Sequence, residues 1–485
     1  MTNVVLERRR AGVLLHPTAL PGTSGKLGQA AMQFVDMLAQ AGITVWQTLP
    51  LGPTHADLSP YQSLSAHAGN PMLIDLAELL APGLLEEHEL TACSRRAAME
   101  RASERFQAGN YRESEVFNHQ AYEDFLAHHH WLRDFALFVA NVETFPGSSW
   151  LEWPEAMRNH EPAALAAQQE AKLGTLQRVY LEQYLFFVQW SALRRYAAER
   201  GVFLFGDIPI FVAHNSADVW AAPELYKLDD SGNPRVVAGV PPDYFSPDGQ
   251  HWGNPIFDWN RMAGDGYRWW IDRLASQQER FDLLRIDHFR GLQAYWEIPA
   301  DRPSPVHGYW MPGPADGFLE ACFRALPNLP LVAENLGIIG DDVEALRHRF
   351  RLPGMTVMQF GFDGSANNPH LLHNHKEWDV AYTGTHDNDT SLGWYQSLDE
   401  HTRHHVNRYL RIEGAHMPWS MIQAAMGSVS RLVIVPIQDF LGLGPEARFN
   451  TPGTIEGNWL WALPDNYREQ LDTARLKAML ELYGR

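Results

Sequence analysis

Residues 283–290 read Leu-Leu-Arg-Ile-Asp-His-Phe-Arg, a short apolar run that contains one arginine and ends at an acidic residue. Apolar runs of this length are typical of strands buried on both faces, which occur in parallel sheets. Similar runs recur along the chain. The eight predicted strands are residues 12–15, 45–49, 202–205, 283–286, 331–333, 356–360, 380–383 and 432–437.

Between these runs the sequence has helical patterns. Residues 180–200, for example, read as a helix that ends before Gly201, a residue type common just after helix ends. Eight parallel strands alternating with helices predict an α/β fold of the (β/α)₈ barrel (TIM barrel) type. We therefore expect residues 1–485 to form a single catalytic barrel, with its chemistry at the carboxyl ends of the strands.

Two connections are too long for plain loops, and long loops in compact domains usually have a function. Residues 70–174 are helical in pattern and predict a subdomain inserted after the second strand. His128, His129 and His130 lie within it; adjacent helical residues point in different directions, which favours a solvated face over a metal site. Residues 212–258 are rich in proline, glycine and aromatic residues, and they predict an irregular inserted loop after the third strand.

Composition narrows the possible partners. The formal net charge of −19 argues against nucleic acids and anionic membranes, and an uncharged substrate fits it best. No stretch approaches the roughly 20 apolar residues of a membrane span. The two cysteines, Cys93 and Cys322, suit a reducing cytoplasm. The sequence contains no metal-ligand or cofactor motif, so we expect an enzyme that needs neither.

Acidic residues follow several of the predicted strands, at Asp207, Asp287, Glu334, Asp387 and Asp439. A single acid at such a position is usually a loop cap or a solvent-facing charge. In a barrel, however, the carboxyl ends of the strands meet at one rim. Paired carboxylates in one cleft are what glycoside cleavage requires, because one donates a proton and the other attacks or stabilises the anomeric carbon.

Three basic residues stand next to these acids. Arg285 lies two residues before Asp287, on the same face of the strand, where its guanidinium would stabilise the anionic carboxylate. It could equally form a structural ion pair inside the barrel, and the two roles are compatible. His288 and His386 adjoin Asp287 and Asp387 and can form hydrogen bonds with sugar hydroxyls.

At these residues the sequence resembles the 4-α-glucanotransferases of the amylomaltase or disproportionating-enzyme type, glycoside hydrolase family 77 of the α-amylase clan. The resemblance extends from Gly12 nearly to the C-terminus. Its motifs, in order, are GVLLHPTALPG (12–22), WQTLPLGPT (46–54), SPYQS (59–63), GNP (69–71), GDIPIFV (206–212), GVPPDYFS (239–246), GQHWGNP (249–255), RIDHFRG (285–291), AENLG (333–337), GTHDNDT (384–390) and GNWLW (457–461).

The resemblance implies a role for each matching residue. Asp287 matches the family's nucleophile, Glu334 its general acid/base and Asp387 the acid that stabilises the transition state. The positions that match contacts with the reacting sugar or the glucan chain are Tyr61, Asp207, Asp243, Tyr244, Phe245, Trp252, Arg285, His288 and His386. The implied partners are maltooligosaccharides and α-1,4-glucans.

Two stretches that flank the expected cleft depart from the family pattern, GTSGKLG at 22–28 and HADL at 55–58. They leave the preferred donor chain open. Two other functions use the same acids: an amylase-like α-1,4-glucan hydrolase, and a non-catalytic carbohydrate-binding protein. The presence of all three acids argues against the second. The aromatic loop at 239–254 favours transfer over hydrolysis, because it can exclude water and position an acceptor.

Overall fold

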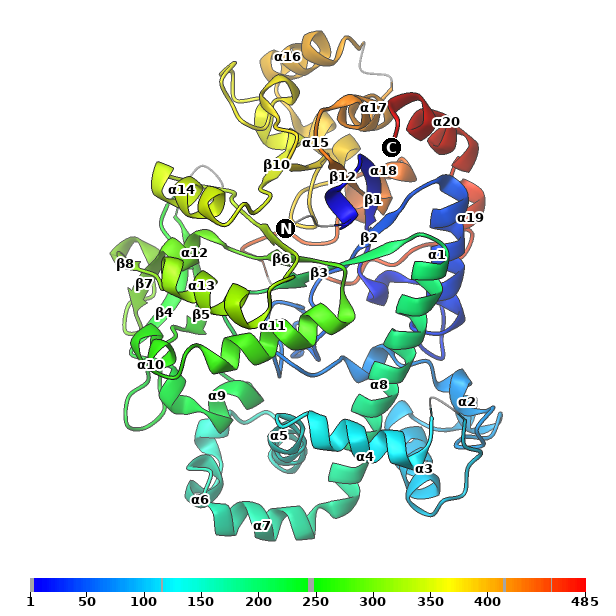
Figure 1. Cartoon of the computed structure of the whole chain (residues 1–485), viewed down its shortest axis with the longest axis vertical. Coiled ribbons are helices and arrows are strands. Elements are labelled where there is room, and N and C mark those ends of the chain that lie inside the picture. The colour runs from blue at the N-terminus through cyan, green and yellow to red at the C-terminus, as the bar shows by residue number, and fades with distance from the viewer. Residues whose placement is uncertain (1–3, 115–116, 243–247, 413–415, 455) are drawn as a thin grey trace.

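A sheet of eight parallel strands forms the centre of the molecule (Figure 1). The computed structural model describes residues 4–114, 117–242, 248–412, 416–454 and 456–485. In sheet order the strands are β10 (Met355–Val357), β11 (Val380–Tyr382), β12 (Leu432–Pro436), β1 (Arg10–Leu14), β2 (Val45–Gln47), β3 (Phe203–Ile208), β6 (Leu283–Ile286) and β9 (Leu331–Ala333). Each overlaps a predicted strand, and the barrel prediction is confirmed.

The strands are buried on both faces, as their apolar sequences predict. Every residue of β1, β2, β6 and β12 is buried. The sheet is nearly closed, because the amide of Ala333 at the end of β9 donates to the carbonyl of Pro353, just before β10, at 2.9 Å. The curved sheet thus brings the carboxyl ends of strands far apart in sequence to one rim.

Helices surround this sheet. They include α1 (Gln29–Ala41), α11 (Arg268–Arg280), α13 (Ala315–Ala325), α14 (Asp341–Arg349), α15 (Ser391–Ser397), α16 (Glu400–Leu410), α17 (Trp419–Gly427), α18 (Ile437–Phe440), α19 (Tyr467–Gln470) and α20 (Thr473–Tyr483). The last helix, α20, packs against α1 and α17. Among the described residues, no helix combines the length and the apolar character needed to cross a membrane.

The connection between β2 and β3 contains most of the remaining helices, which lie below the barrel in Figure 1. They are α2 (Glu89–Ala92), α3 (Arg95–Gln107), α4 (His119–His128), α5 (Leu132–Thr144), α6 (Glu155–Arg158), α7 (Pro162–Ala171) and α8 (Leu173–Glu199). Side chains at the helix starts satisfy free amides: Ser94 accepts a hydrogen bond from Ala97 N, and Asn118 from Ala121 N. The long α8 returns the chain to the barrel at β3.

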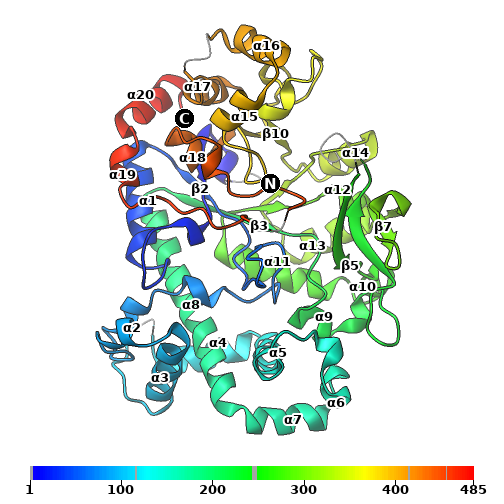
Figure 2. The same ribbon diagram turned by 180° about the vertical axis from the view of Figure 1, so that it is seen from behind.

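A second, antiparallel sheet corrects the prediction of an irregular loop at 212–258. Two strands lie in this segment, β4 (Val236–Val240) and β5 (Gln250–Pro255), together with the short helix α9 (Ala217–Ala221). They pair with β7 (Ala294–Pro299) and β8 (Tyr309–Pro312) in the order β5-β4-β7-β8, and this sheet lies at one side of the molecule (Figure 2). The partner strands follow Asp287, so two separate connections combine into one sheet. The sequence of residues 212–258 alone did not predict β4 and β5, because the strand that pairs with β4 outside this segment, β7, lies later in the chain.

Candidate active site

A cleft of about 1340 Å³ opens at the carboxyl ends of the barrel strands. Eight of the predicted site residues line it: Tyr61, Trp252, Arg285, Asp287, His288, Glu334, His386 and Asp387. Asp207 lies at the end of β3, is buried, and reaches the cleft through Tyr61 and Arg285. Asp243, Tyr244 and Phe245 lie outside the described residues.

Arg285 joins two of the predicted acids. Its Nη2 donates to Oδ1 of Asp287 at 2.7 Å, and its Nη1 donates to Oδ1 and Oδ2 of Asp207 at 2.8 and 2.7 Å. Burial lowers the pKa of Arg285, but Asp207 and Asp287 together raise it well above its ordinary value. The guanidinium is therefore a fixed positive charge that contacts Asp287 and forms a buried ion pair with Asp207.

Tyr61 extends this network to the cleft wall. Its hydroxyl donates to Oδ2 of Asp207 at 2.7 Å, and its ring stacks on His386 with centroids 5.2 Å apart and planes 15° apart. Burial and the neighbouring Asp207 raise the pKa of Tyr61 well above its usual value, so the phenol keeps its proton. Tyr61 thus connects the buried ion pair to the residues that follow β11.

Glu334 accepts its hydrogen bonds from backbone amides, whereas Asp287 accepts one from a guanidinium. Its Oε2 accepts a hydrogen bond from the backbone amide of His288 at 2.7 Å, and its Oε1 from Leu336 N at 2.8 Å. These amides and Arg285 favour the ionised form, but burial outweighs them and, with the nearby charge of Asp287, raises the pKa to about 7. Near neutral pH this carboxyl can both give and take a proton.

Asp387 is held by two neighbours. Asn450 donates from Nδ2 to Oδ1 at 2.6 Å, and Nε2 of His386 lies 3.3 Å from Oδ2. Arg448 donates to the backbone carbonyl of Asp387 at 2.7 Å. About 44% of the Asp387 side chain stays exposed, so a ligand in the cleft can reach it.

His288 and Trp252 contact each other in the cleft lining. The backbone of His288 has φ of 53°, a left-handed conformation, and its amide points at Glu334. Burial lowers the pKa of His288 to about 4, so the ring is neutral at neutral pH. The His288 and Trp252 rings form a T-shaped pair, with centroids 4.8 Å apart and planes 89° apart. Strand β5 brings Trp252 to this position, which explains how the second sheet contributes to the cleft.

Several cleft residues were not predicted from the sequence. They are Trp310 on β8, Gln359 and Phe360 after β10, Trp394 on α15, and Arg448, Asn450 and Trp459 after β12. Trp459 lies in the quoted motif GNWLW, and its ring centroid is 6.1 Å from that of His386. The other six gave no local signal, because they reach the cleft only through the tertiary fold.

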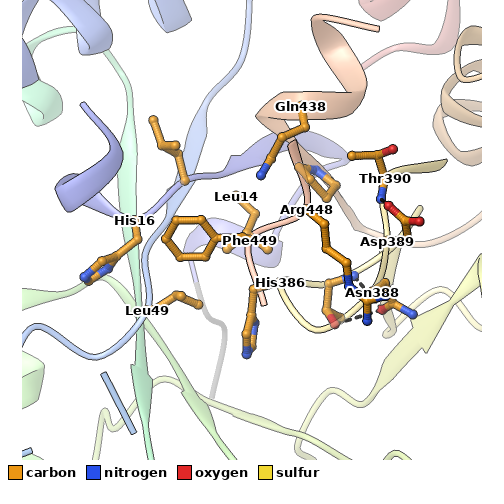
Figure 3. A pocket seen from close by; sticks show the side chains of 13 residues that line it. Leu14, His16, Leu49, His386, Asn388, Asp389, Thr390, Gln438, Arg448 and Phe449 are labelled. Carbon is orange, nitrogen blue, oxygen red and sulfur yellow. Dashed lines mark hydrogen bonds between the residues drawn. The ribbon is translucent and has the colours of Figure 1, made fainter. Parts of the chain in front are cut away.

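A smaller pocket adjoins the cleft, and His386 lines both (Figure 3). Leu14, Leu49 and Phe449 form part of the wall of the smaller pocket, whereas Arg448 and Asn388 line both the pocket and the cleft. Its volume is only about 20 Å³, room for about one water molecule. Burial, reinforced by His386, lowers the pKa of His16 to about 3, so no positive charge arises there at neutral pH.

Asp439 does not belong to the cleft, contrary to its expected place at the rim. It is completely buried in α18. Its oxygens accept hydrogen bonds from the hydroxyls of Thr383 and Ser391, at 2.8 and 2.6 Å, and from Ser391 N at 2.7 Å. Asp439 therefore ties β11 and α15 to the end of β12. Within the described residues, no group of three or more His, Cys, Asp or Glu side chains is arranged to hold a metal ion.

Comparison with known proteins gives one consistent result. A family model described as 4-alpha-glucanotransferase matches residues 15–467. A 4-alpha-glucanotransferase of Thermus thermophilus is 44% identical over 498 residues, covering 98% of this chain and 98% of that protein. A 4-alpha-glucanotransferase of Synechocystis sp. is 43% identical and covers 99% of both chains.

Solved structures agree. The amylomaltase of Streptococcus agalactiae, solved in complex with acarbose, superposes with a TM-score of 0.93 at 35% identity, covering 99% of this chain and 100% of that chain. The amylomaltase of Corynebacterium glutamicum has a TM-score of 0.76 at 17% identity, covering 99% of this chain and 76% of that one, which shows a shared fold.

Proposed function

The chain belongs to the 4-alpha-glucanotransferase family, and we propose that Asp287, Glu334 and Asp387 perform its transfer reaction by a retaining double displacement. The enzyme moves a segment of an α-1,4-glucan to the 4-hydroxyl of an acceptor sugar. The observation that supports these roles best is the contrast between the two acids Asp287 and Glu334. Asp287 is bound by a fixed guanidinium, whereas the pKa of Glu334 is raised to about 7.

In the first half-reaction, an oxygen of Asp287 attacks the anomeric carbon of the donor. The bond between that carbon and the glycosidic oxygen breaks, and Glu334 gives its proton to the departing oxygen. Arg285 holds the attacking carboxylate in place, with its other nitrogen anchored on Asp207. The products are a covalent glycosyl-enzyme and a released fragment with a free 4-hydroxyl.

In the second half-reaction, the same groups act in reverse. Glu334, now ionised, takes the proton of the acceptor 4-hydroxyl while the acceptor oxygen attacks the anomeric carbon and Asp287 leaves. A pKa near 7 suits a group that must be an acid in one step and a base in the next. Both oxygens of Glu334 accept backbone amides, and this fixes the carboxyl between the two steps.

Asp387 stabilises the positive charge that develops on the reacting sugar. Asn450 and His386 hold the carboxylate from two sides, so little reorganisation is needed when the charge appears. Aromatic side chains line the same cleft at Tyr61, Trp252, Trp310 and Trp459. Flat rings of this kind can stack on the apolar faces of glucose units. Maltooligosaccharides and α-1,4-glucans are accordingly the proposed donors and acceptors.

The proposed compartment is the cytoplasm. Both cysteines, Cys93 and Cys322, are free thiols, and free thiols suit a reducing compartment. The net charge of −19 and the neutral substrate argue against nucleic acids as partners.

Incubation of the purified enzyme with maltotriose tests the proposal. Transfer predicts glucose together with chains longer than maltotriose. Glucose and maltose alone would identify a hydrolase, and unchanged maltotriose would identify a binding protein. Chromatography of the products, with reducing ends measured in parallel, distinguishes the three outcomes.

A further inference from the structure

Helix α11 buries a polar stripe where an amphipathic helix normally buries apolar residues. Arg273, Gln277 and Arg280 follow at intervals of four and three residues, and therefore share one face of the helix. The two arginines are each only 3% exposed, and Gln277 is 9% exposed. Buried charged side chains are normally paired with an opposite charge.

These three side chains line a cavity of about 30 Å³. Its other lining residues come from the segment that includes Ser63 and Ser65, next to Tyr61, and from residues 207–209 and 211–213 at and after the end of β3. The cavity adjoins the sugar cleft, with which it shares Tyr61, Pro209 and Phe211. Its volume accommodates one or two water-sized groups and is too small for a sugar.

The two guanidiniums lack partners for most of their N–H groups. Within the described residues, Arg273 makes no side-chain hydrogen bond, and both its Nε and Nη1 are buried without an acceptor. Arg280 donates only from Nη2, to the carbonyl of His67, and its Nε has no acceptor. Neither guanidinium forms a salt bridge with a described carboxylate. Each unpartnered buried donor costs free energy unless a further acceptor is present.

Aromatic rings compensate these charges only in part. The Cζ of Arg273 lies 4.8 Å from the Trp270 ring centroid, and that of Arg280 lies 4.4 Å from the Phe187 centroid. A ring face attracts the guanidinium plane but leaves the N–H groups at its edge free. Burial lowers the pKa of each arginine to about 10, so both remain positively charged at neutral pH.

Among the lining residues the only carboxylate is that of Asp207. Its oxygens already accept hydrogen bonds from Arg285 and Tyr61, so its charge is balanced by another cation. Asp218 acts electrostatically on Arg273, and Glu279 acts on Arg280, but neither carboxylate forms an ion pair with its arginine among the described residues. Asp218 instead accepts a hydrogen bond from the amide of Ala66 at 2.8 Å. Two guanidiniums therefore line one small cavity without a carboxylate in direct contact with either.

We propose that this cavity binds a small monovalent anion of chloride size, held by N–H groups of Arg273, Gln277 and Arg280. A water molecule could accept the same hydrogen bonds, but it would leave the two buried guanidiniums without an anion in contact. A monatomic anion satisfies both the donors and the charge, and sulfate or phosphate exceeds the available volume. The anion links α11 to the segment next to Tyr61 and to the chain that follows β3.

Bromide identifies the occupant directly, because it replaces chloride and scatters anomalously. Crystals of the wild-type enzyme grown in sodium bromide should show an anomalous peak within hydrogen-bond distance of Arg273 and Arg280. Density for water alone, without anomalous signal, would overturn the proposal. The measurement needs no variant and no sugar, so its result is independent of the transfer reaction.

Thermal unfolding tests the same site in solution. Sodium chloride should raise the Tm of the wild-type enzyme by about 2 °C or more over sodium gluconate at equal ionic strength, in a saturable manner. Arg273→Gln should abolish this difference, and Arg268→Gln, an exposed position on the same helix, should keep it. If Arg273→Gln does not fold, Gln277→Leu replaces it, with a weakened chloride effect expected. Equal Tm values for the wild type in the two salts would contradict the proposal.

Discussion

The guanidinium of Arg285 donates a hydrogen bond to the carboxylate of Asp287 across 2.7 Å, two residues further along the same strand end. The other side of this guanidinium holds Asp207 through both carboxylate oxygens. Asp287 is therefore fixed by a charge that is itself anchored in the barrel. Glu334, by contrast, is buried and accepts hydrogen bonds from two backbone amides. Asp287 is thus bound by a guanidinium and Glu334 by neutral donors.

Asp287→Asn should abolish transfer, because an amide cannot form the glycosyl-enzyme. We expect kcat to fall by roughly 10³-fold or more, as in other enzymes that lose their nucleophile. Mass spectrometry with an activated glucosyl donor should detect no covalent adduct. Asp301→Asn, whose side chain is 77% exposed, provides a control that should keep full activity. More than trace activity of Asp287→Asn, with contaminants excluded, would remove Asp287 from this role.

The pH dependence should report Glu334. As the acid of the first step, Glu334 must be protonated in the free enzyme, so kcat/KM for maltotriose should be level below its pKa. Because that pKa is raised to about 7, kcat/KM should fall by about tenfold per pH unit above it. Glu334→Gln should still form the intermediate from a glucosyl fluoride, which needs no proton donor. If kcat/KM of Glu334→Gln with the glucosyl fluoride still falls above pH 7 as it does in the wild-type enzyme, the ionisation belongs to another group.

Asp387→Asn should reduce turnover far more than binding. Its contacts strengthen as charge develops at the anomeric carbon, and the loss of such a preorganised group costs on the order of 10²–10³ in kcat. Glucan affinity, measured by calorimetry on an inactive Asp287→Asn background, should change little. An equal loss in affinity and in kcat would show that Asp387 is an ordinary substrate contact.

Asp207→Asn should destabilise the enzyme because it leaves part of the buried charge of Arg285 uncompensated. Breaking a buried ion pair costs about 3–5 kcal/mol, whereas an exposed pair contributes about 1 kcal/mol or less. Asp36→Asn, which disrupts the part-exposed pair with Arg200, is the matched control. Thermal and denaturant unfolding should show a clearly larger loss for Asp207→Asn. Similar losses in the two variants would mean that the buried pair contributes no more than a surface one.

Trp252→Ala should change the partition between transfer and hydrolysis. The ring lines the cleft and faces His288, so its removal opens a path for water and takes away a stacking surface for the acceptor. Aromatic contacts contribute about 1 kcal/mol, which corresponds to a roughly fivefold lower ratio of transfer products to new reducing ends. Trp378→Ala, an exposed tryptophan that does not line the cleft, should leave the ratio unchanged. A slower Trp252→Ala enzyme with an unchanged ratio would refute water exclusion by this side chain.

Much of the site was predictable because its main residues lie at strand ends. Asp287 and Glu334 directly follow the apolar runs of β6 and β9, and the barrel geometry places such positions at one rim. The same reasoning failed for Asp439, which also follows a strand. Its side chain turns inward and is satisfied by Thr383 and Ser391, partners whose positions the local sequence does not reveal.

The sequence by itself determined where the eight strands lie, that they are buried on both faces, and which acids follow them. Apolar runs and the residues at their ends are local features of the chain. Only the tertiary structure decided which side chains meet. Asn450 holds Asp387 from 63 residues away, and β4 and β5 become a sheet only by pairing with β7 and β8. The raised pKa of Glu334 likewise depends on burial by distant segments. Contacts of this kind join residues that are distant in the sequence and form only when the whole chain folds. The local pattern of apolar and polar residues therefore does not predict them.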